Sequence, residues 1–214
     1  MTLKLAFRPL TSDRWDDLVD LFGAERGACA GCWCMWPRLR GVDFKAMQKL
    51  QRRDAFRRLV ADGPPPGLLA YDGRTAVGWV AISPRRAVKR FNIAKISAPV
   101  EDEAAHSGDA ALDQTWALTC FYVRNSHRGW GLTSRLAAAA VAYAKTHKAM
   151  AVEACAVEPA KRLIWGEAFV GVASALRPLG FIEVARRSPK RPLLRLELRS
   201  ATQSSSDHKR VRQR

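Results

Sequence analysis

Residues 115–145 combine an apolar run, two closely spaced glycines and an Ala-rich stretch, a combination suited to binding an anion. Thr115–Val123 is apolar almost throughout, as expected of a strand that is buried on both faces. Gly129 and Gly131 then lead directly into a predicted helix. Free backbone N–H groups and the helix dipole attract negative charge at a helix start. Glycine also lets a ligand approach the backbone without a Cβ in the way. The stretch therefore predicts a phosphate or pyrophosphate site.

Two common phosphate-binding motifs do not fit this stretch. A P-loop requires Gly-Lys followed by Ser or Thr, and the sequence contains no such run. A Rossmann fingerprint requires three glycines at fixed spacing, early in a repeated βαβ arrangement, which is also absent. Nucleotide binding of either type is therefore disfavoured.

A third motif does fit. Arg128-Gly129-Trp130-Gly131-Leu132-Thr133 resembles the acyl-CoA signature of the GNAT superfamily, Arg/Gln-x-x-Gly-x-Gly/Ala, and Phe121-Tyr122-Val123 resembles its pantetheine-binding strand. The resemblance implies an α/β fold with a mixed, mostly antiparallel central sheet flanked by helices. It also implies an N-acetyltransferase that moves an acetyl group from acetyl-CoA, as co-substrate, to an amine of unknown identity by direct attack.

The resemblance assigns cofactor binding residue by residue. Backbone groups of Phe121 and Val123 would pair with the pantetheine amides, and amides of the glycine turn would hold the pyrophosphate. An N–H near Val123 would polarise the thioester carbonyl. The residues expected to bind the cofactor are Phe121, Tyr122, Val123, Arg128, Gly129, Trp130, Gly131, Leu132, Thr133 and Ser134.

The sequence departs from the family pattern at two positions. Thr133 stands where a small Gly or Ala is usual, and Leu176 stands where many relatives have the tyrosine that protonates the departing thiolate. The usual general acid is therefore missing. The run Gly31-Cys32-Trp33-Cys34-Met35-Trp36 resembles that of a poorly described GNAT subgroup, and this resemblance names no substrate.

Three carboxylates are candidates for a general base, which the attack of an amine requires because a lysine-like amine is protonated at neutral pH. Glu153, on the strand after the glycine-rich helix, is the first candidate for the catalytic residue, and Glu158 and Asp113 are weaker ones. The alternative interpretation of Glu153 is a solvated carboxylate or a salt-bridge partner.

The loop at residues 29–36 is rich in cysteine and tryptophan. Trp33 and Trp36 are predicted to bind the acceptor, because this loop helps to form the acceptor pocket in GNAT-like folds. Cys29, Cys32 and Cys34 offer three thiols to a metal, but a tetrahedral site needs a fourth ligand and no histidine lies nearby. We therefore predict no metal site.

The remaining sequence supplies the elements that position these residues. Apolar periodicity and turn residues predict one mixed α/β sheet in residues 1–198, without internal repeats. Strands are predicted near residues 3–7, 68–71, 75–82, 115–123, 149–157, 180–186 and 193–198, and helices near 15–22, 43–59, 132–145 and 166–176. Residues 199–214 are polar and basic, and a disordered tail is expected there.

Composition limits the class of protein and its partners. The chain has 214 residues, no apolar run long enough to span a membrane and no secretory signal, which predicts a cytoplasmic location. Its net charge of +16 attracts polyanions. An alternative function is therefore a catalytically weak GNAT-like module that binds nucleic acid or an acidic partner. The acceptor, a small molecule or a protein, stays open, as does a homodimer.

Overall fold

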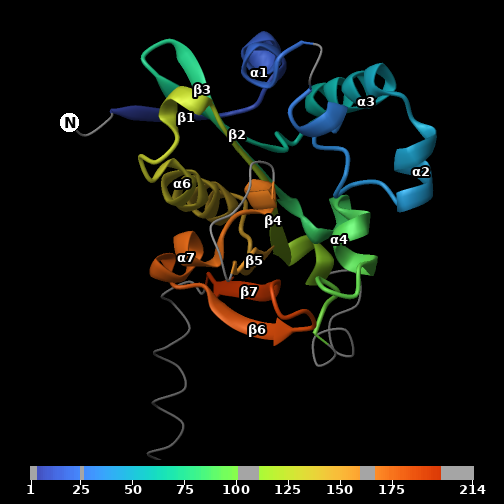
Figure 1. Ribbon diagram of the computed structural model, residues 1–214, viewed down its shortest axis with the longest axis vertical. Coiled ribbons are helices and arrows are strands. Elements are labelled where there is room, and N and C mark those ends of the chain that lie inside the picture. The colour runs from blue at the N-terminus through green and yellow to red at the C-terminus, as the bar shows by residue number, and fades with distance from the viewer. Residues whose placement is uncertain (1–3, 25–26, 101–110, 160–166, 199–214) are drawn as a thin grey trace, which may run out of the picture.

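The computed structural model describes residues 4–24, 27–100, 111–159 and 167–198, which form a seven-stranded mixed sheet (Figure 1). The strand order is β1-β2-β3-β4-β5-β7-β6, and only β4 and β5 pair in parallel. The strands are β1 (Leu5–Pro9), β2 (Gly67–Asp72), β3 (Thr75–Pro84), β4 (Thr115–Val123), β5 (Ala151–Cys155), β6 (Ile182–Arg186) and β7 (Pro192–Glu197). The predicted fold class is confirmed.

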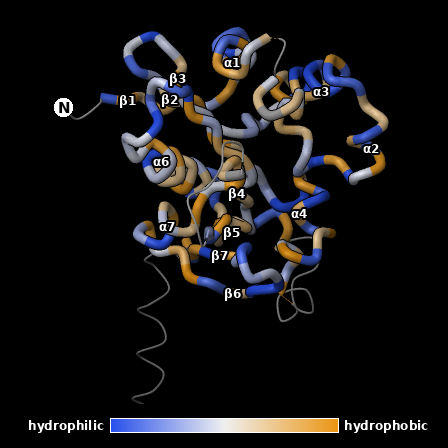
Figure 2. The backbone as a smooth tube through the Cα atoms, viewed as in Figure 1, coloured by the Kyte–Doolittle hydropathy of each residue, from blue (hydrophilic) through white to orange (hydrophobic). Residues whose placement is uncertain are grey.

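Helices cover both faces of this sheet (Figure 1). The helices are α1 (Trp15–Phe22), α2 (Gly41–Ala46), α3 (Lys49–Asp62), α4 (Lys89–Ile93), α6 (Leu132–Thr146) and α7 (Ala173–Leu176). One face packs against α6 and α7. The opposite face packs against α1, α3 and the loop at residues 29–36, which we call the Cys/Trp loop. Figure 2 shows α3 as mostly hydrophilic, in keeping with a helix that buries only Phe56 and Val60. None of the described helices is both long and apolar enough to span a membrane.

Two predicted helices are wrong in extent. The stretch predicted as one helix over residues 43–59 is two helices, because Gln48 and Gln51 form a capping box that starts α3 anew. From Glu167 on, the stretch predicted as a helix over 166–176 is a 3₁₀ turn, η5 (Glu167–Val170), followed by the short α7. Gly171, with φ of 83°, separates the two. The expected tail at 199–214 lies outside the described residues.

A β-bulge in β4 decides which side chains face which layer. Ala81 pairs with Cys120, and the next β3 residue, Ile82, pairs with Leu118, so Thr119 is the extra residue on β4. The bulge shifts the alternation of side chains by one position. Leu118 and Phe121 therefore lie in the core beneath α6, whereas Cys120 and Tyr122 face the Cys/Trp loop.

Candidate active site

Strands β4 and β5 separate at the bulge. Their parallel pairing begins at Thr115–Ala151 and ends at Leu118–Ala154, while β4 continues to Val123 beside β3. The end of the pairing coincides with Thr119, because a bulge bends its strand and breaks the ladder. The edge of β4 after Thr119 is therefore no longer paired with β5.

The backbone of this unpaired edge is oriented for a ligand. The Arg124 N–H donates to the carbonyl of Val77 on β3, at 2.9 Å. Backbone groups alternate in direction along a strand, so those of Phe121 and Val123 point away from β3. They face the side on which β5 has ended, which is where the sequence predicts pantetheine.

The glycine turn follows directly at the end of β4. Gly129 and Gly131 have φ of 82° and 70°, which favours glycine, and a Cβ at either would meet nothing within 4 Å. Gly131 is the N-cap of α6, without a side-chain cap and with no acidic residue in the first helical turn. Among the described residues, the start of α6 thus offers helix N–H groups with no carboxylate in its own first turn to repel an anion.

Side chains around the turn differ in position. Arg128 lies at the surface, where its Nε donates to the Val123 carbonyl at 3.2 Å. Trp130 is 55% exposed, whereas Leu132 is buried in the core, so only the backbone of Leu132 can face a ligand. His127 lies within hydrogen-bond range of Asp72, at 3.3 Å, on the side of the turn nearest β2.

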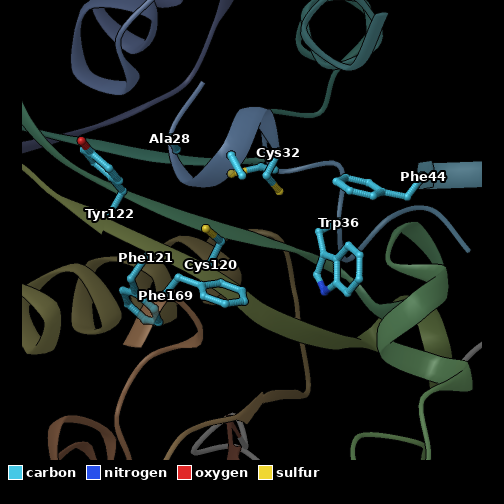
Figure 3. Close-up of a pocket in the computed structure, with 10 residues that line it drawn as sticks. Ala28, Cys32, Trp36, Phe44, Cys120, Phe121, Tyr122 and Phe169 are labelled. Atoms are coloured by element: carbon cyan, nitrogen blue, oxygen red, sulfur yellow. The ribbon is translucent and has the colours of Figure 1, made fainter. Parts of the chain in front are cut away.

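An aromatic pocket of about 200 Å³ lies between β4 and the Cys/Trp loop (Figure 3). Its lining comprises Ala28, Ala30, Cys32, Cys34, Trp36, Phe44, Cys120, Phe121, Tyr122 and Phe169. None of these residues carries a fixed charge. In Figure 3 the sulfur of Cys120 points from β4 toward the loop that carries Cys32.

Two thiols of the aromatic pocket interact. The Trp79 indole N–H donates to the Cys34 sulfur at 3.1 Å, and Cys34 also shares a hydrogen bond with Cys120. The bond with Cys120 is the largest cause that lowers the pKa of the Cys34 thiol, and it outweighs the opposing effect of burial. Trp79 and the nearby Arg38 add to this lowering.

A second cavity, the arginine pocket, has a volume of about 270 Å³ and lies where β4 and β5 separate. Its lining comprises Trp36, Pro37, Arg90, Phe91, Ala94, Ile96, Ser97, Leu118, Thr119, Cys155, Phe169, Val170 and Arg191. It shares Trp36 and Phe169 with the aromatic pocket. The two cavities thus meet beside the bulge, at the unpaired edge of β4.

Comparison with known proteins identifies the fold and the family. The model of the acetyltransferase (GNAT) family matches residues 15–164, well over half of the chain. The chain belongs to the GNAT acetyltransferase family. It is therefore an acyltransferase, as the sequence predicted, and the match gives no support to the alternative of a nucleic-acid-binding module.

Solved structures described as acetyltransferases share this fold at low sequence identity. The chain is similar to yncA from Salmonella typhimurium, described with its cofactor acetyl-CoA, with a TM-score of 0.51, 13% identity and 92% and 96% of the two chains covered. It is also similar to an N-acetyltransferase from Staphylococcus aureus Mu50, with a TM-score of 0.51, 12% identity and 92% and 99% covered. No curated protein matches the sequence.

The three carboxylates predicted as general bases are all held by arginines. Glu153 on β5 has no exposed surface and pairs with Arg85, and with Arg195 at 3.1 Å. Both of its oxygens accept hydrogen bonds from guanidinium groups, an arrangement that favours a structural ion pair over proton abstraction. A catalytic role for Glu153 stays a prediction.

The two weaker candidates lie at the surface. Glu158 bonds to Arg177 at 2.6 Å and Arg186 at 2.5 Å, and these bonds lower the pKa of its carboxyl. Asp113 bonds to Arg86 at 2.6 Å, which likewise lowers the pKa of Asp113. Neither carboxylate lines the aromatic or the arginine pocket.

The two predicted acceptor-binding tryptophans occupy different environments. Trp33 is fully buried and stacks on Trp15 at 5.9 Å between ring centroids. Trp36 is 38% exposed and lines both pockets. The structure places only Trp36 where an acceptor could touch it. Leu176, at the position of the family tyrosine, is fully buried under the sheet and offers no proton.

The predicted absence of a metal site concerns the Cys/Trp loop. Among the residues whose side chains the structure describes, no group of three or more His, Cys, Asp or Glu side chains is placed to hold a metal ion. The Cys29 side chain lies outside those residues, so the three-thiol alternative stays untested.

Several residues of the site were missed by sequence reasoning. Arg90 and Arg191 come from segments about a hundred residues apart, and Phe169 follows a glycine-containing stretch with no motif of its own. No local pattern links these residues to the acyl-CoA signature. Only the sheet, which places α4, the η5 turn and the β6–β7 connection beside Thr119, brings them together.

Proposed function

We propose that this GNAT protein transfers the acetyl group of acetyl-CoA to an amine that enters the arginine pocket. Pantetheine would pair with the backbone of Phe121 and Val123, and the pyrophosphate would bind the N–H groups from Gly129 to Ser134. The observation that carries the proposal is the separation of β4 from β5 at Thr119, which leaves an unpaired stretch of β4 on the way to the glycine turn that precedes α6.

The reaction needs no covalent enzyme intermediate. The lone pair of the amine nitrogen attacks the thioester carbonyl carbon, the C–N bond forms and the C–S bond breaks. CoA leaves as the thiolate, and the proton lost from nitrogen passes to water or to the thiolate. The chain contributes orientation of the two substrates and backbone N–H groups that stabilise the carbonyl oxygen.

We further propose that the loop from Gly31 to Trp36 defines a subgroup of the family. It forms a wall of the aromatic pocket through Cys32, Cys34 and Trp36. Its composition would therefore affect which acyl group and which acceptor fit.

The test is calorimetric titration of the protein with acetyl-CoA and with CoA, comparing Gly131→Asp with Gly131→Asn. Both side chains suit an N-cap and tolerate positive φ, so the pair differs mainly in charge. A carboxylate facing the pyrophosphate should weaken binding by about 10- to 100-fold more than the amide does, the size of one charge-assisted hydrogen bond.

Thermal unfolding of both variants serves as the folding control. Equal midpoints with unequal CoA affinities would support the phosphate site. No CoA binding by the unaltered protein at low salt would overturn the proposed function.

A further inference from the structure

The arginine pocket contains guanidinium groups whose hydrogen-bonding capacity is only partly used. Arg191 donates from Nη2 to the Cys155 carbonyl at 2.7 Å, and Arg90 donates from Nε to the Leu39 carbonyl at 3.2 Å. Arg191 Nε and Arg90 Nη2 are buried without a hydrogen-bond partner among the described residues. A guanidinium has five N–H donors, and each of these two groups therefore keeps a buried donor that a water or a ligand would satisfy.

The charge around these arginines is one-sided. No aspartate or glutamate belongs to the described lining of the pocket, which otherwise consists of apolar, aromatic and small neutral residues. Glu153, which is buried on β5, is already paired with Arg85 and Arg195. An amine alone, as a cation, would be repelled here, whereas an anionic group would be attracted.

The phosphates of the cofactor do not explain these arginines. Thr119 lines the pocket, and Val123 ends β4 just before the glycine turn. Four residues of strand span about 13 Å, so the pocket and the helix start lie at different ends of the unpaired edge. The neutral pantetheine would occupy the distance between them.

From this arrangement we propose that the acceptor is an amine that also carries a carboxylate and an apolar side chain, such as an apolar amino acid. This inference rests on the proposed function. Arg191, assisted by Arg90, binds the carboxylate, while Trp36, Phe91 and Phe169 contact the apolar side chain. The amine is left beside Thr119, next to the thioester.

This assignment also explains how the amine is made neutral without a carboxylate base in the pocket. Nearby positive charge disfavours the protonated form of an amine and lowers its pKa. Arg90 and Arg191 would thus shift the bound acceptor toward the neutral, nucleophilic form. The same two residues therefore serve recognition and reactivity.

The test uses methionine, phenylalanine and tryptophan, each compared with its carboxamide. Binding of each compound to the CoA-saturated protein is measured by calorimetry, and acetylation with acetyl-CoA is followed by mass spectrometry. We expect the acid to bind at least about 10-fold more tightly than its amide for one or more pairs, because the carboxylate gains a charge-assisted contact. Arg191→Gln should remove that difference, and Arg191→Lys should restore part of it.

A matched control is Lys190→Gln. It removes one positive charge from the neighbouring, exposed position, whose side chain does not line the pocket. Lys190→Gln should leave the preference for the acid unchanged. Lys190→Gln and Arg191→Gln should both bind CoA like the unaltered protein.

Two outcomes would overturn the proposal separately. CoA binding without any preference for the acids, including no binding of either member of the pairs, contradicts the acceptor class alone. Failure to bind CoA contradicts the proposed function and removes this inference with it.

Discussion

The aromatic pocket and the arginine pocket share Trp36 and Phe169, yet they offer different chemistry to a ligand. The aromatic pocket is formed by the Cys/Trp loop and the side of β4 that carries Cys120 and Tyr122, and its polar side-chain groups are thiols, one phenol and one indole. The arginine pocket is formed by α4, η5 and the β6–β7 connection, and it contains two guanidinium groups. The bulge at Thr119 sets the boundary between them.

Under the proposed function, this difference would suit the two substrates of an acyl transfer. An acyl thioester is uncharged and suits apolar walls, whereas an amino acid carries charge that must be paired on entering a pocket. A protein that kept both substrates in one undivided cavity would have to satisfy both demands with the same residues. In the proposed reaction, two pockets that share only Trp36 and Phe169 would hold the substrates apart, and the residues of one lining alone could be altered without changing the other.

The largest effect is expected for Trp33, which is fully buried between two residues of the aromatic pocket, Cys32 and Cys34. Trp33→Ala should lower the free energy of unfolding by about 3–5 kcal/mol, because a fully buried indole is removed from the Trp15 and Phe22 cluster. Trp36→Ala should cost less than about 1.5 kcal/mol, the range of one aromatic contact. Urea unfolding of both variants measures the difference.

The same pair separates stability from binding. Trp36→Ala should raise the KM for the acceptor, because Trp36 lines both pockets and lies 3.7 Å from the Arg90 guanidinium. A Trp33 variant that kept its stability but lost acceptor affinity would instead restore the role predicted for Trp33 from the sequence.

A similarly large effect is expected from the ion pair behind the arginine pocket. Glu153→Ala should lower the free energy of unfolding by about 3–5 kcal/mol, because it removes the buried carboxylate that pairs with the buried Arg85. Arg85 also bonds to Asn92 and to the Ser97 carbonyl, so its loss of order would reach the wall of the pocket. Glu153→Gln keeps the shape and should cost less than Glu153→Ala.

Kinetics on Glu153→Gln decide between the two interpretations of this residue. If Glu153 is structural, the folded variant keeps the pH dependence of kcat/KM. Loss of the acidic limb of that profile, where kcat/KM rises as a general base loses its proton, in a stably folded variant would identify Glu153 as the general base.

The parts of the site that sequence reasoning recovered are contiguous in the chain. The glycine turn, the strand before it and the helix after it lie within residues 115–146, and their patterns are local. The bulge at Thr119 could not be predicted, because an unbroken apolar run gives no signal of where the alternation shifts. The partners of Glu153 could not be predicted from the sequence either, since Arg85 and Arg195 lie 68 and 42 residues away in the chain. The arginine pocket depends on that same long-range assembly.

The smallest effect we predict compares one buried thiol from each pocket. Hydrogen bonding to Cys120 lowers the pKa of Cys34, whereas burial raises the pKa of Cys155, where Arg191 opposes the rise only in part. Since the thiolate is the reactive form, modification by methyl methanethiosulfonate should begin at a lower pH for Cys34 than for Cys155. Mass spectrometry of the modified peptides across the pH range gives both midpoints, with Cys34→Ser identifying the Cys34 signal.

Cys120→Ser sharpens this comparison, because it alters the hydrogen bond that is the largest cause of the lowered pKa of Cys34. A hydroxyl should stabilise the thiolate differently from a thiol, so the Cys34 midpoint should move while that of Cys155 stays constant. Midpoints are compared rather than rates, because access to both buried sulfurs limits the rates themselves. Equal midpoints in the unaltered protein would contradict this prediction, because the two pockets would then have the same effect on the pKa of their thiols. The remaining difference between the pockets would be the two guanidinium groups that line the arginine pocket.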